Sequence, residues 1–316
     1  MKLATFSIGA SGARVGLISA AQDAVLDLAA GATRPGPFGD MIELMRSGAT
    51  GLDQVNDIAE RTGYSGQHWH ALGDVTLLAP IPRPTQLRDF AGFEGHLKDG
   101  AHGLMKLLAA EKGLPLPNAP AELPEPMRKY PLYYFQNRMN VIGPDARVGW
   151  PDYIGKLDFE LEIGACIGVD ARNVRREDAG SYIFGFTIYN DVSGRDVQSR
   201  QMPGGLGPCK AKSFDAGNVI GPWIVTRDEL PDPYGRMGRV RVNGETWAEA
   251  PAVGTVHDFA EMIMFASEGE TIHAGEVLGS GTISGCCGLE MDRWIKRGDV
   301  VDLEFEGIGT LRNVYG

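Results

Sequence analysis

Residues 158–162 read D-F-E-L-E and place two carboxylates two positions apart in an otherwise apolar run. Side chains alternate between the two faces of a β-strand, so Glu160 and Glu162 would lie on the same face. A second strand-like run, residues 186–191, ends at Asp191. Neighbouring carboxylates repel each other without a cation, so this grouping favours a divalent metal ion over the alternative, an exposed acidic strand face.

Two residues further upstream could join this chemistry. Asp89 follows a proline-rich segment, and His96 comes seven residues later, at the start of a helical pattern. Taken alone, an Asp or a His is more often simply a polar residue on the protein surface.

A glycine-rich turn, G-S-G-T-I-S-G, covers residues 279–285. Its glycines fall at the first, third and seventh positions and no clear helix follows it, so we reject a dinucleotide-binding loop.

The chain has 316 residues, of which 30 are basic and 41 acidic, giving a formal net charge of -11. This balance argues against nucleic acid or an anionic membrane surface as a partner, because phosphate groups require a positive field. No apolar run approaches the roughly 18 residues that span a bilayer. The cysteines match neither a disulfide framework nor a paired zinc motif, and no apolar signal segment begins the chain, so we expect buried free thiols and a cytoplasmic location.

The length predicts one large domain with a smaller companion, or two domains of similar size. Residues 1–80 alternate short apolar runs with turn residues, and helical patterns cover residues 40–45 and 52–60. Three prolines between positions 80 and 84 place the boundary with the second unit, residues 81–316. We therefore expect a β-rich N-terminal domain followed by a larger second domain.

The second unit is rich in strands and poor in helices. The clearest helix covers residues 255–268, with Thr255 and Asp258 as its capping box. A weaker helix at 96–111 is interrupted by two glycines and could serve as a moving lid. The proline-rich segment 113–126 ends this helix in an extended, exposed loop. Strands are expected at 158–169, 185–189, 221–226, 238–242, 300–305 and 309–313.

Several motifs occur in a fixed order along the second unit. They are Asp89 with His96, D-F-E-L-E at 158–162, N-D-V-S-G-R-D-V-Q at 190–198, K-S-F-D at 212–215, G-P-W at 221–223, G-S-G-T-I-S-G at 279–285 and G-I-G-T-L-R-N at 307–313. Taken in order, these motifs resemble the fumarylacetoacetate hydrolase family. The resemblance covers residues 85–316, whereas residues 1–80 are similar only in length and β character. It implies a mainly β fold of the α+β class: a mixed β-roll catalytic domain, a small β-rich N-terminal domain, and a homodimer.

The resemblance also implies a metal site. Glu160, Glu162 and Asp191 match the three metal ligands that the family shares, and Asp89 matches a fourth acid found in the fumarylacetoacetases. All-oxygen coordination suits a hard cation, Mg²⁺ first, with Mn²⁺ or Ca²⁺ as alternatives. The sequence shows no cluster of thiols and imidazoles that would favour zinc.

His96 resembles the general base with which the family activates water. Glu290 matches the position of its carboxylate partner, whereas relatives with a short lid carry an H-x-x-E pair that His96 and Asp99 echo. We prefer Glu290, because a buried acid orients the imidazole and stabilises its cationic form.

Further matches concern the substrate. Lys212 and Gln198 match positions that bind substrate oxygens, and Lys212 would also stabilise developing negative charge. Arg195 and Thr282, in the matched motifs, complete the expected substrate-binding set. Tyr134 could line the pocket or pack in the core.

The implied function is a metal-dependent hydrolase that cleaves a C–C bond in a β-diketone or a 2,4-diketo acid such as an acylpyruvate, in the catabolism of aromatic compounds. Water would add to the distal carbonyl with help from His96 and Glu290, and the metal ion and Lys212 would hold the resulting enolate. One alternative is a decarboxylase, isomerase or hydratase of a keto acid on the same site. Another is a metal-stabilised β protein without catalysis.

Overall fold

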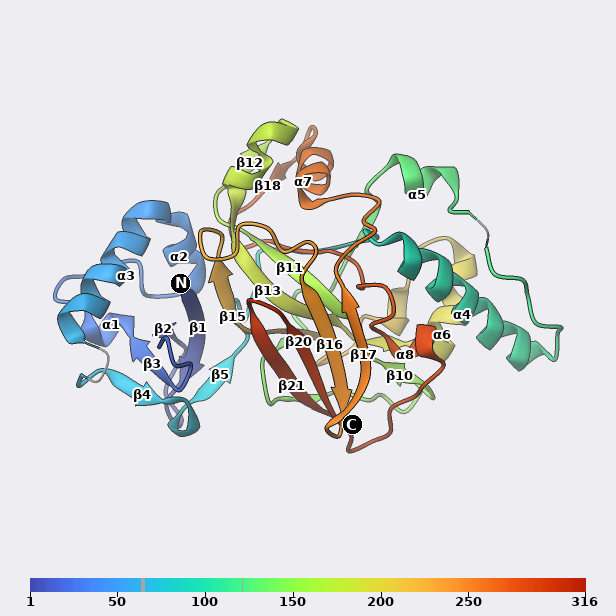
Figure 1. Ribbon diagram of the computed structural model, residues 1–316, viewed down its shortest axis with the longest axis horizontal. Coiled ribbons are helices and arrows are strands. Elements are labelled where there is room, and N and C mark those ends of the chain that lie inside the picture. The colour runs from blue at the N-terminus through green and yellow to red at the C-terminus, as the bar shows by residue number, and fades with distance from the viewer. Residues whose placement is uncertain (64–65, 121) are drawn as a thin grey trace.

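A mixed sheet runs through the whole protein, as a computed structural model shows for residues 1–63, 66–120 and 122–316 (Figure 1). The predicted sheet-rich α+β fold is confirmed. Two short strands branch from the sheet, β5 (Thr76–Leu78) beside β1 and β8 (Val141–Ile142) beside β15. The main path runs β4 (Trp69–Ala71), β3 (Ala24–Asp27), β2 (Arg14–Ile18), β1 (Lys2–Ser7), β15 (Asn218–Thr226), β13 (Ile183–Asp191), β11 (Leu161–Ile167), β19 (Val277–Gly279), β6 (Leu87–Phe90) and β7 (Tyr133–Phe135).

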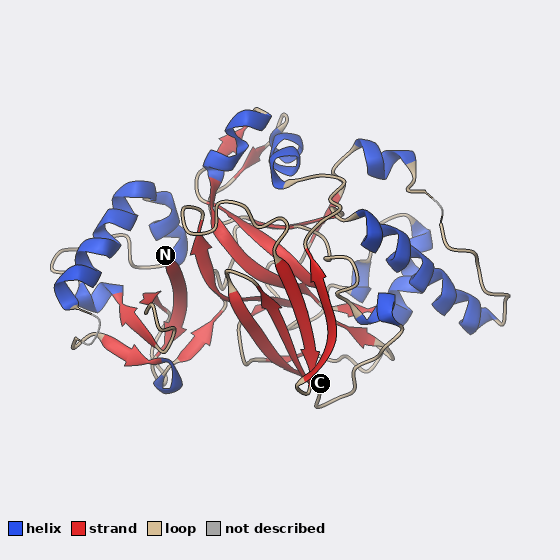
Figure 2. Cartoon of the chain, in the orientation of Figure 1, coloured by secondary structure: helices blue, strands red, loops and turns tan. Residues whose placement is uncertain are grey.

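A second sheet of five strands covers one side of the first (Figure 2). Its strands in order are β17 (Glu245–Pro251), β16 (Met237–Val242), β20 (Val300–Phe305), β21 (Gly309–Tyr315) and β9 (Arg147–Val148). Apolar side chains of both sheets, among them Ile163, Val240 and Leu303, form one buried cluster. Burial of apolar side chains between the two sheets is the main source of stability of such a fold.

Short elements complete the architecture. Two small strand pairs are β10 (Leu157–Asp158) with β14 (Ser193–Gly194) and β12 (Ala171–Arg172) with β18 (Thr271–Ile272). The 3-10 helices cover Leu72–Asp74, Arg176–Tyr182, Met202–Gly204 and Cys209–Ala211. No helix among the described residues combines the length and the apolar character that crossing a membrane requires.

The N-terminal strands continue the central sheet, because Lys2 of β1 pairs with Val225 of β15. Three helices cover them, α1 (Leu28–Gly31), α2 (Met41–Arg46) and α3 (Gly48–Thr62), and α3 begins four residues before the predicted position. The domain boundary near residue 80 stays a prediction.

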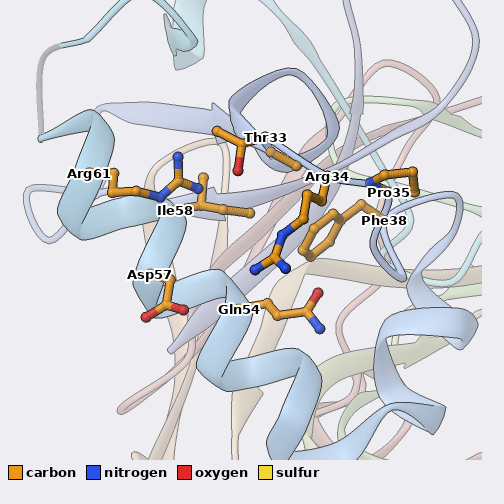
Figure 3. A pocket seen from close by; sticks show the side chains of 9 residues that line it. Thr33, Arg34, Pro35, Phe38, Gln54, Asp57, Ile58 and Arg61 are labelled. Atoms are coloured by element: carbon orange, nitrogen blue, oxygen red, sulfur yellow. The ribbon is translucent and has the colours of Figure 1, made fainter.

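This part of the chain has a hollow of about 320 Å³ between α3 and the loop that follows α1 (Figure 3). Arg34 and Arg61 line it together with Gln54. Arg61 lies in the last turn of α3, where a cation complements the partial negative charge of the helix end.

Helix α4 (Glu94–Lys112) is longer than predicted and carries His96 in its first turn. The two glycines that suggested weakness are buried contact points. Gly103 faces Leu289 of the short helix α8 (Gly288–Met291), and a Cβ at Gly103 would lie 2.7 Å from Leu289 Cγ. A Cβ at Gly100 would lie 3.3 Å from the His96 ring. The glycines therefore allow α4 to approach the site closely.

Two other helices lie near the predicted segments. Residues 113–120 and 122–124, between α4 and α5 (Glu125–Lys129), form no regular helix or strand. Helix α7 (Phe259–Ser267) has a capping box made by Asp258 and Glu261, so the predicted box of Thr255 and Asp258 is wrong. The reason is that Thr255 forms an extended bridge with Phe93, four residues before the helix begins. A third helix, α6 (Arg195–Gln201), packs against α4.

We expect Gly103→Ala to lower the free energy of unfolding by up to about 2 kcal/mol, because overpacking costs about 1–3 kcal/mol and exceeds a helix-propensity gain of about 1 kcal/mol. Urea unfolding followed by circular dichroism measures the change. Leu289→Ala is the matched background: it removes the two side-chain contacts and leaves only the 3.2 Å approach to the Leu289 carbonyl oxygen, so Gly103→Ala should cost less there. Stabilisation in both backgrounds would contradict the close packing of α4 on α8.

Candidate active site

An acidic cluster lies where strands β13, β11, β19 and β6 run side by side. Gly279 of β19 pairs with both Asp89 of β6 and Gly164 of β11. Asp89, Glu162 and Asp191 each offer a carboxylate oxygen, and these three atoms lie within 4.8 Å of one another. All three side chains are buried. The structure thus brings three of the four predicted metal ligands into one cluster.

Gly279 leaves the space that this cluster needs. A Cβ there would lie 2.8 Å from both Asp89 Oδ1 and Glu162 Oε2, closer than real Cβ atoms come to other atoms. The residues that follow contact the same carboxylate: Gly281 N–H donates to Glu162 Oε2 over 3.1 Å, and the Thr282 hydroxyl lies 3.5 Å from Glu162 Oε1. Thr282 is therefore in place beside the cluster.

Glu160, the fourth predicted ligand, lies next to the cluster. Its carboxylate accepts a hydrogen bond from Arg195 Nη2 over 2.7 Å and another from Lys212 Nζ. Burial alone would raise the pKa of Glu160, but the positive charges of Arg195 and Lys212 outweigh burial and hold that pKa below its ordinary value. Glu160 is thus an ionised carboxylate at neutral pH, and its binding of metal stays a prediction.

Lys212 joins Glu160 to the cluster, because its ammonium also contacts Asp191. Burial disfavours the charged ammonium, yet the carboxylates of Asp191 and Glu160 raise the pKa of Lys212 above its ordinary value. The buried lysine therefore keeps its positive charge and its ability to donate hydrogen bonds.

The clustered acids carry more negative charge than their neighbours balance. Burial raises the pKa of Asp89, and the charge of Glu162 raises it further. Burial also raises the pKa values of Glu162 and Asp191. Among the described residues, Asp89 Oδ1 has no hydrogen-bond partner although it is buried. A hard divalent cation fits this set of oxygen ligands, since it would neutralise the charge and bind the unpaired oxygen.

Two residues of the β7 edge complete the cluster. Tyr134 pairs with Asp89 across the strands, and its hydroxyl lies 2.5 Å from Asp89 Oδ2 and 2.5 Å from Asp191 Oδ2. Gln136 donates to Asp191 Oδ1. From the sequence the role of Tyr134 stayed open between pocket and core, and Gln136 was not predicted. The signal was the two-residue spacing, which places both side chains on the Asp89 face of the strand.

His96 lies between two carboxylates. Its Nδ1 is 3.3 Å from Glu290 Oε2, and its Nε2 is 3.4 Å from Glu160 Oε1. Asp99, the other partner considered, is exposed on α4. The structure therefore places Glu290 beside His96, at the edge of the acidic cluster.

Glu290 is held in turn by its own neighbours. Gly285 N–H and the Cys287 thiol each donate to Glu290 Oε2 over 3.1 Å. Burial would raise the pKa of Glu290, but the interaction with His96 outweighs it, and the pKa lies below its ordinary value. Cys287 Sγ is 3.9 Å from His96 Nδ1. The expectation that the chain lacks a cluster of thiol and imidazole is therefore wrong, because the fold joins residues 191 positions apart.

A buried ion-pair network fixes these parts relative to each other. Arg195 donates to Asp158 through Nε over 2.7 Å, and to Gln198 through Nη1 over 2.9 Å. Asp158 also accepts from the backbone N–H groups of Gly288 and Leu289. This buried carboxylate at the end of β10, missed as a functional residue, anchors the segment that carries Glu290 to the segment that leads into Glu160 and β11. The substrate-binding roles of Arg195 and Gln198 stay predictions.

Comparisons with known proteins agree with this architecture. Residues 105–315 match the family described as fumarylacetoacetate (FAA) hydrolase C-terminal. Over 284 residues the chain is 28% identical to an oxaloacetate tautomerase of Bacillus subtilis (strain 168), which covers 88% of this chain and 87% of that protein.

Two solved structures have a similar fold. A fumarylacetoacetate hydrolase from Exiguobacterium antarcticum is 25% identical with a TM-score of 0.73, covering 100% of this chain and 99% of that chain. A maleylpyruvate hydrolase from Sphingobium sp. SYK-6, in complex with manganese(II) ion and pyruvate, is 24% identical with a TM-score of 0.72, covering 100% of both chains.

We expect Glu162→Gln to abolish stabilisation by Mg²⁺ or Mn²⁺ without destabilising the metal-free protein. The amide removes a repelling charge and still accepts the Gly281 hydrogen bond. Thermal unfolding with EDTA and with saturating metal measures both effects; at a metal concentration of 100 times Kd, the wild type should gain about 2.7 kcal/mol. The exposed Glu249→Gln is the control and should respond to metal as the wild type does. An unchanged response in Glu162→Gln would contradict the site.

Proposed function

Because the chain belongs to the fumarylacetoacetate hydrolase family, we propose that it hydrolyses a C–C bond in a 2,4-diketo acid or a β-diketone with a divalent metal ion. The observation that carries this proposal is the position of His96, which lies between Glu290 and Glu160 at the edge of the acidic cluster. A histidine oriented by a buried carboxylate is suited to accept a proton from water.

Asp89, Glu162 and Asp191 would hold the metal ion, with Glu160 beside them. Mg²⁺ is our first choice, with Mn²⁺ and Ca²⁺ as alternatives, because all the ligand atoms are oxygens. When bound, the ion would supply Lewis-acid polarisation of the substrate's oxygens.

The chain's own residues would perform the proton transfers. His96 accepts a proton from water, and the resulting hydroxide oxygen bonds to the carbonyl carbon at the acyl end. Glu290 stabilises the imidazolium that forms. The bond between that carbon and the neighbouring methylene then breaks, and its electron pair passes to the enolate of the departing keto acid. A proton returns to the methylene carbon, so that one water yields one carboxylic acid and one methyl ketone.

Lys212 and the predicted substrate-binding residues serve the developing charge. The Lys212 ammonium is buried and lies beside Asp191, where it can donate to the enolate oxygen. Gln198 and Thr282 would orient the substrate's oxygens, whereas Arg195, bound to Asp158 and Glu160, would act by fixing the carboxylates.

A second candidate is keto-enol tautomerisation of a keto acid. The Bacillus subtilis protein, 28% identical over 88% of this chain, bears the name oxaloacetate tautomerase. Tautomerisation moves a proton between an oxygen and a carbon and adds no water, so it needs a base near the substrate but no attack on a carbonyl.

For assembly and location we propose a cytoplasmic homodimer that acts on a small anionic or neutral ketone. The net charge of -11 supports a metal-dependent small-molecule enzyme over a nucleic-acid partner. A role in the catabolism of aromatic compounds is part of the same proposal.

We expect His96→Gln to lower kcat for acylpyruvate hydrolysis by about 10²–10⁴-fold, as loss of a general base does. The assay follows the enol absorbance of an acylpyruvate panel and counts released pyruvate, with Mg²⁺ or EDTA. His102→Gln on the same helix is the matched control, since His102 contacts the Pro117 carbonyl away from the cluster, and it should keep wild-type activity.

The same assay separates the two candidates. Loss of enol absorbance from oxaloacetate without release of any carboxylic acid from the acylpyruvates would favour the tautomerase. Pyruvate release that is unchanged in His96→Gln would contradict the assigned base.

A further inference from the structure

His96, Cys287 and Glu290 form a second cluster of metal-binding atoms beside the acidic one. The atoms His96 Nδ1, Cys287 Sγ and Glu290 Oε2 all lie within 4.8 Å of one another. The proposed reaction uses the imidazole and the carboxylate but gives the thiol no part. Nitrogen, sulfur and oxygen ligands in one place are the ligands of Zn²⁺ and similar borderline ions, whereas Mg²⁺ prefers oxygen alone.

The spacing of the three atoms fits a tetrahedral ion. With Zn–N and Zn–O bonds of about 2.0–2.1 Å and a Zn–S bond of about 2.3 Å, tetrahedral angles place N and O about 3.3 Å apart and S about 3.6 Å from each. The observed distances are 3.3 Å from Nδ1 to Oε2, 3.9 Å from Nδ1 to Sγ and 3.1 Å from Sγ to Oε2. Shifts of a few tenths of an ångström would complete the geometry.

The surroundings support the ligands as they do in zinc sites. A histidine that binds metal through one nitrogen usually donates its other N–H to a carboxylate. His96 Nε2 lies 3.4 Å from Glu160 Oε1, which can accept that hydrogen. The backbone N–H of Gly285 holds Glu290 Oε2, and the backbone of Cys287 is bridged to that of Glu160.

The cluster also contains a buried carboxylate oxygen that accepts no hydrogen bond from the described part of the chain. Glu290 Oε1 is buried and has no hydrogen-bond partner among the residues that the structure describes. The Glu290 side chain is only 4% exposed, while His96 is 17% exposed and offers the open side. With a thiolate and a carboxylate as ligands, a divalent ion would be electrically neutralised in this buried place.

We propose that His96, Cys287 and Glu290 form a second metal site, selective for Zn²⁺ or a similar borderline divalent ion, and that filling this site inhibits the enzyme. On binding, the Cys287 thiol loses its proton to solvent and the thiolate bonds the ion. His96 binds through Nδ1 and carries its proton on Nε2, so it has no lone pair left to accept a proton from water. The inhibition rests on the proposed function, but the binding does not.

The binding test uses Co²⁺ as a probe for Zn²⁺, with Mg²⁺ kept in excess to fill the oxygen cluster. Thiolate ligation gives Co²⁺ a near-ultraviolet charge-transfer band, which needs no activity to be seen. We expect the band in the wild type, its loss in Cys287→Ser, and its retention in Cys286→Ser. Cys286 is the matched control because it is an equally buried neighbour that lies outside the cluster.

A second variant keeps the test decisive if Cys287→Ser does not fold. Glu290→Gln retains the thiol but replaces the anionic carboxylate ligand by a neutral amide. Loss of an outer partner alone costs a metal site about 10–100-fold in affinity, so Co²⁺ affinity should fall by more than about tenfold. Absence of the band from the wild type, or its survival in Cys287→Ser, would overturn the site. Loss of the band in the exposed Cys209→Ser would do the same.

The inhibition is tested separately on the active enzyme. Zn²⁺ should lower wild-type turnover at saturating Mg²⁺, and turnover of Cys286→Ser should fall equally. In Cys287→Ser the ratio of activities with and without Zn²⁺ should rise by about tenfold or more. A cobalt band without inhibition by Zn²⁺ would uphold the site and overturn its regulatory role. A wild type without turnover of any substrate would overturn the proposed function and leave the cobalt result standing.

Discussion

The need to balance buried negative charge governs the centre of this protein. Each of the five central acids is almost fully buried, and two buried cations, Arg195 and Lys212, lie among them. Five carboxylates against two cations leave an excess of three negative charges if all are ionised. Isolated ions are costly to bury, so a bound divalent cation or protonation of some acids must offset the excess. The five acids are Asp89, Asp158, Glu160, Glu162 and Asp191.

The architecture around the cluster serves this constraint. Strand β11 is buried on both faces, so Glu162 points into the interior while its apolar neighbours fill the core. Gly279, which has no Cβ, lets the carboxylates of Asp89 and Glu162 lie close to the backbone of β19. The buried glycines of α4 let this helix pack closely, so that His96 lies beside the carboxylate cluster. Close approach of backbone and helix is thus what allows charge to be concentrated here.

The sequence predicted the parts of this site that depend on local spacing. Alternation along a strand was enough to place Glu160 and Glu162 together, and the family resemblance supplied the Glu290 partner of His96. What could not be predicted depends on contacts between distant segments. Cys287 is held beside His96 by contacts between distant segments: its backbone is bridged to that of Glu160, and the start of α8 donates hydrogen bonds to Asp158. The wrong capping box of α7 has the same origin, since Thr255 is held by a bridge to another segment.

Glu160 lies between the two clusters, and this position would make the site selective between hard and borderline ions. Glu160 faces Lys212 and the oxygen cluster on one side and His96 on the other. A hard ion gains from the all-oxygen set, whereas a borderline ion gains from the thiol and imidazole beyond Glu160. If His96 binds an ion through Nδ1 and keeps a proton on Nε2, it cannot act as a base, so the proposed occupation of the second cluster and the proposed catalysis would exclude each other. The arrangement that suits His96 to the proposed role of base would thus also make it sensitive to a borderline ion.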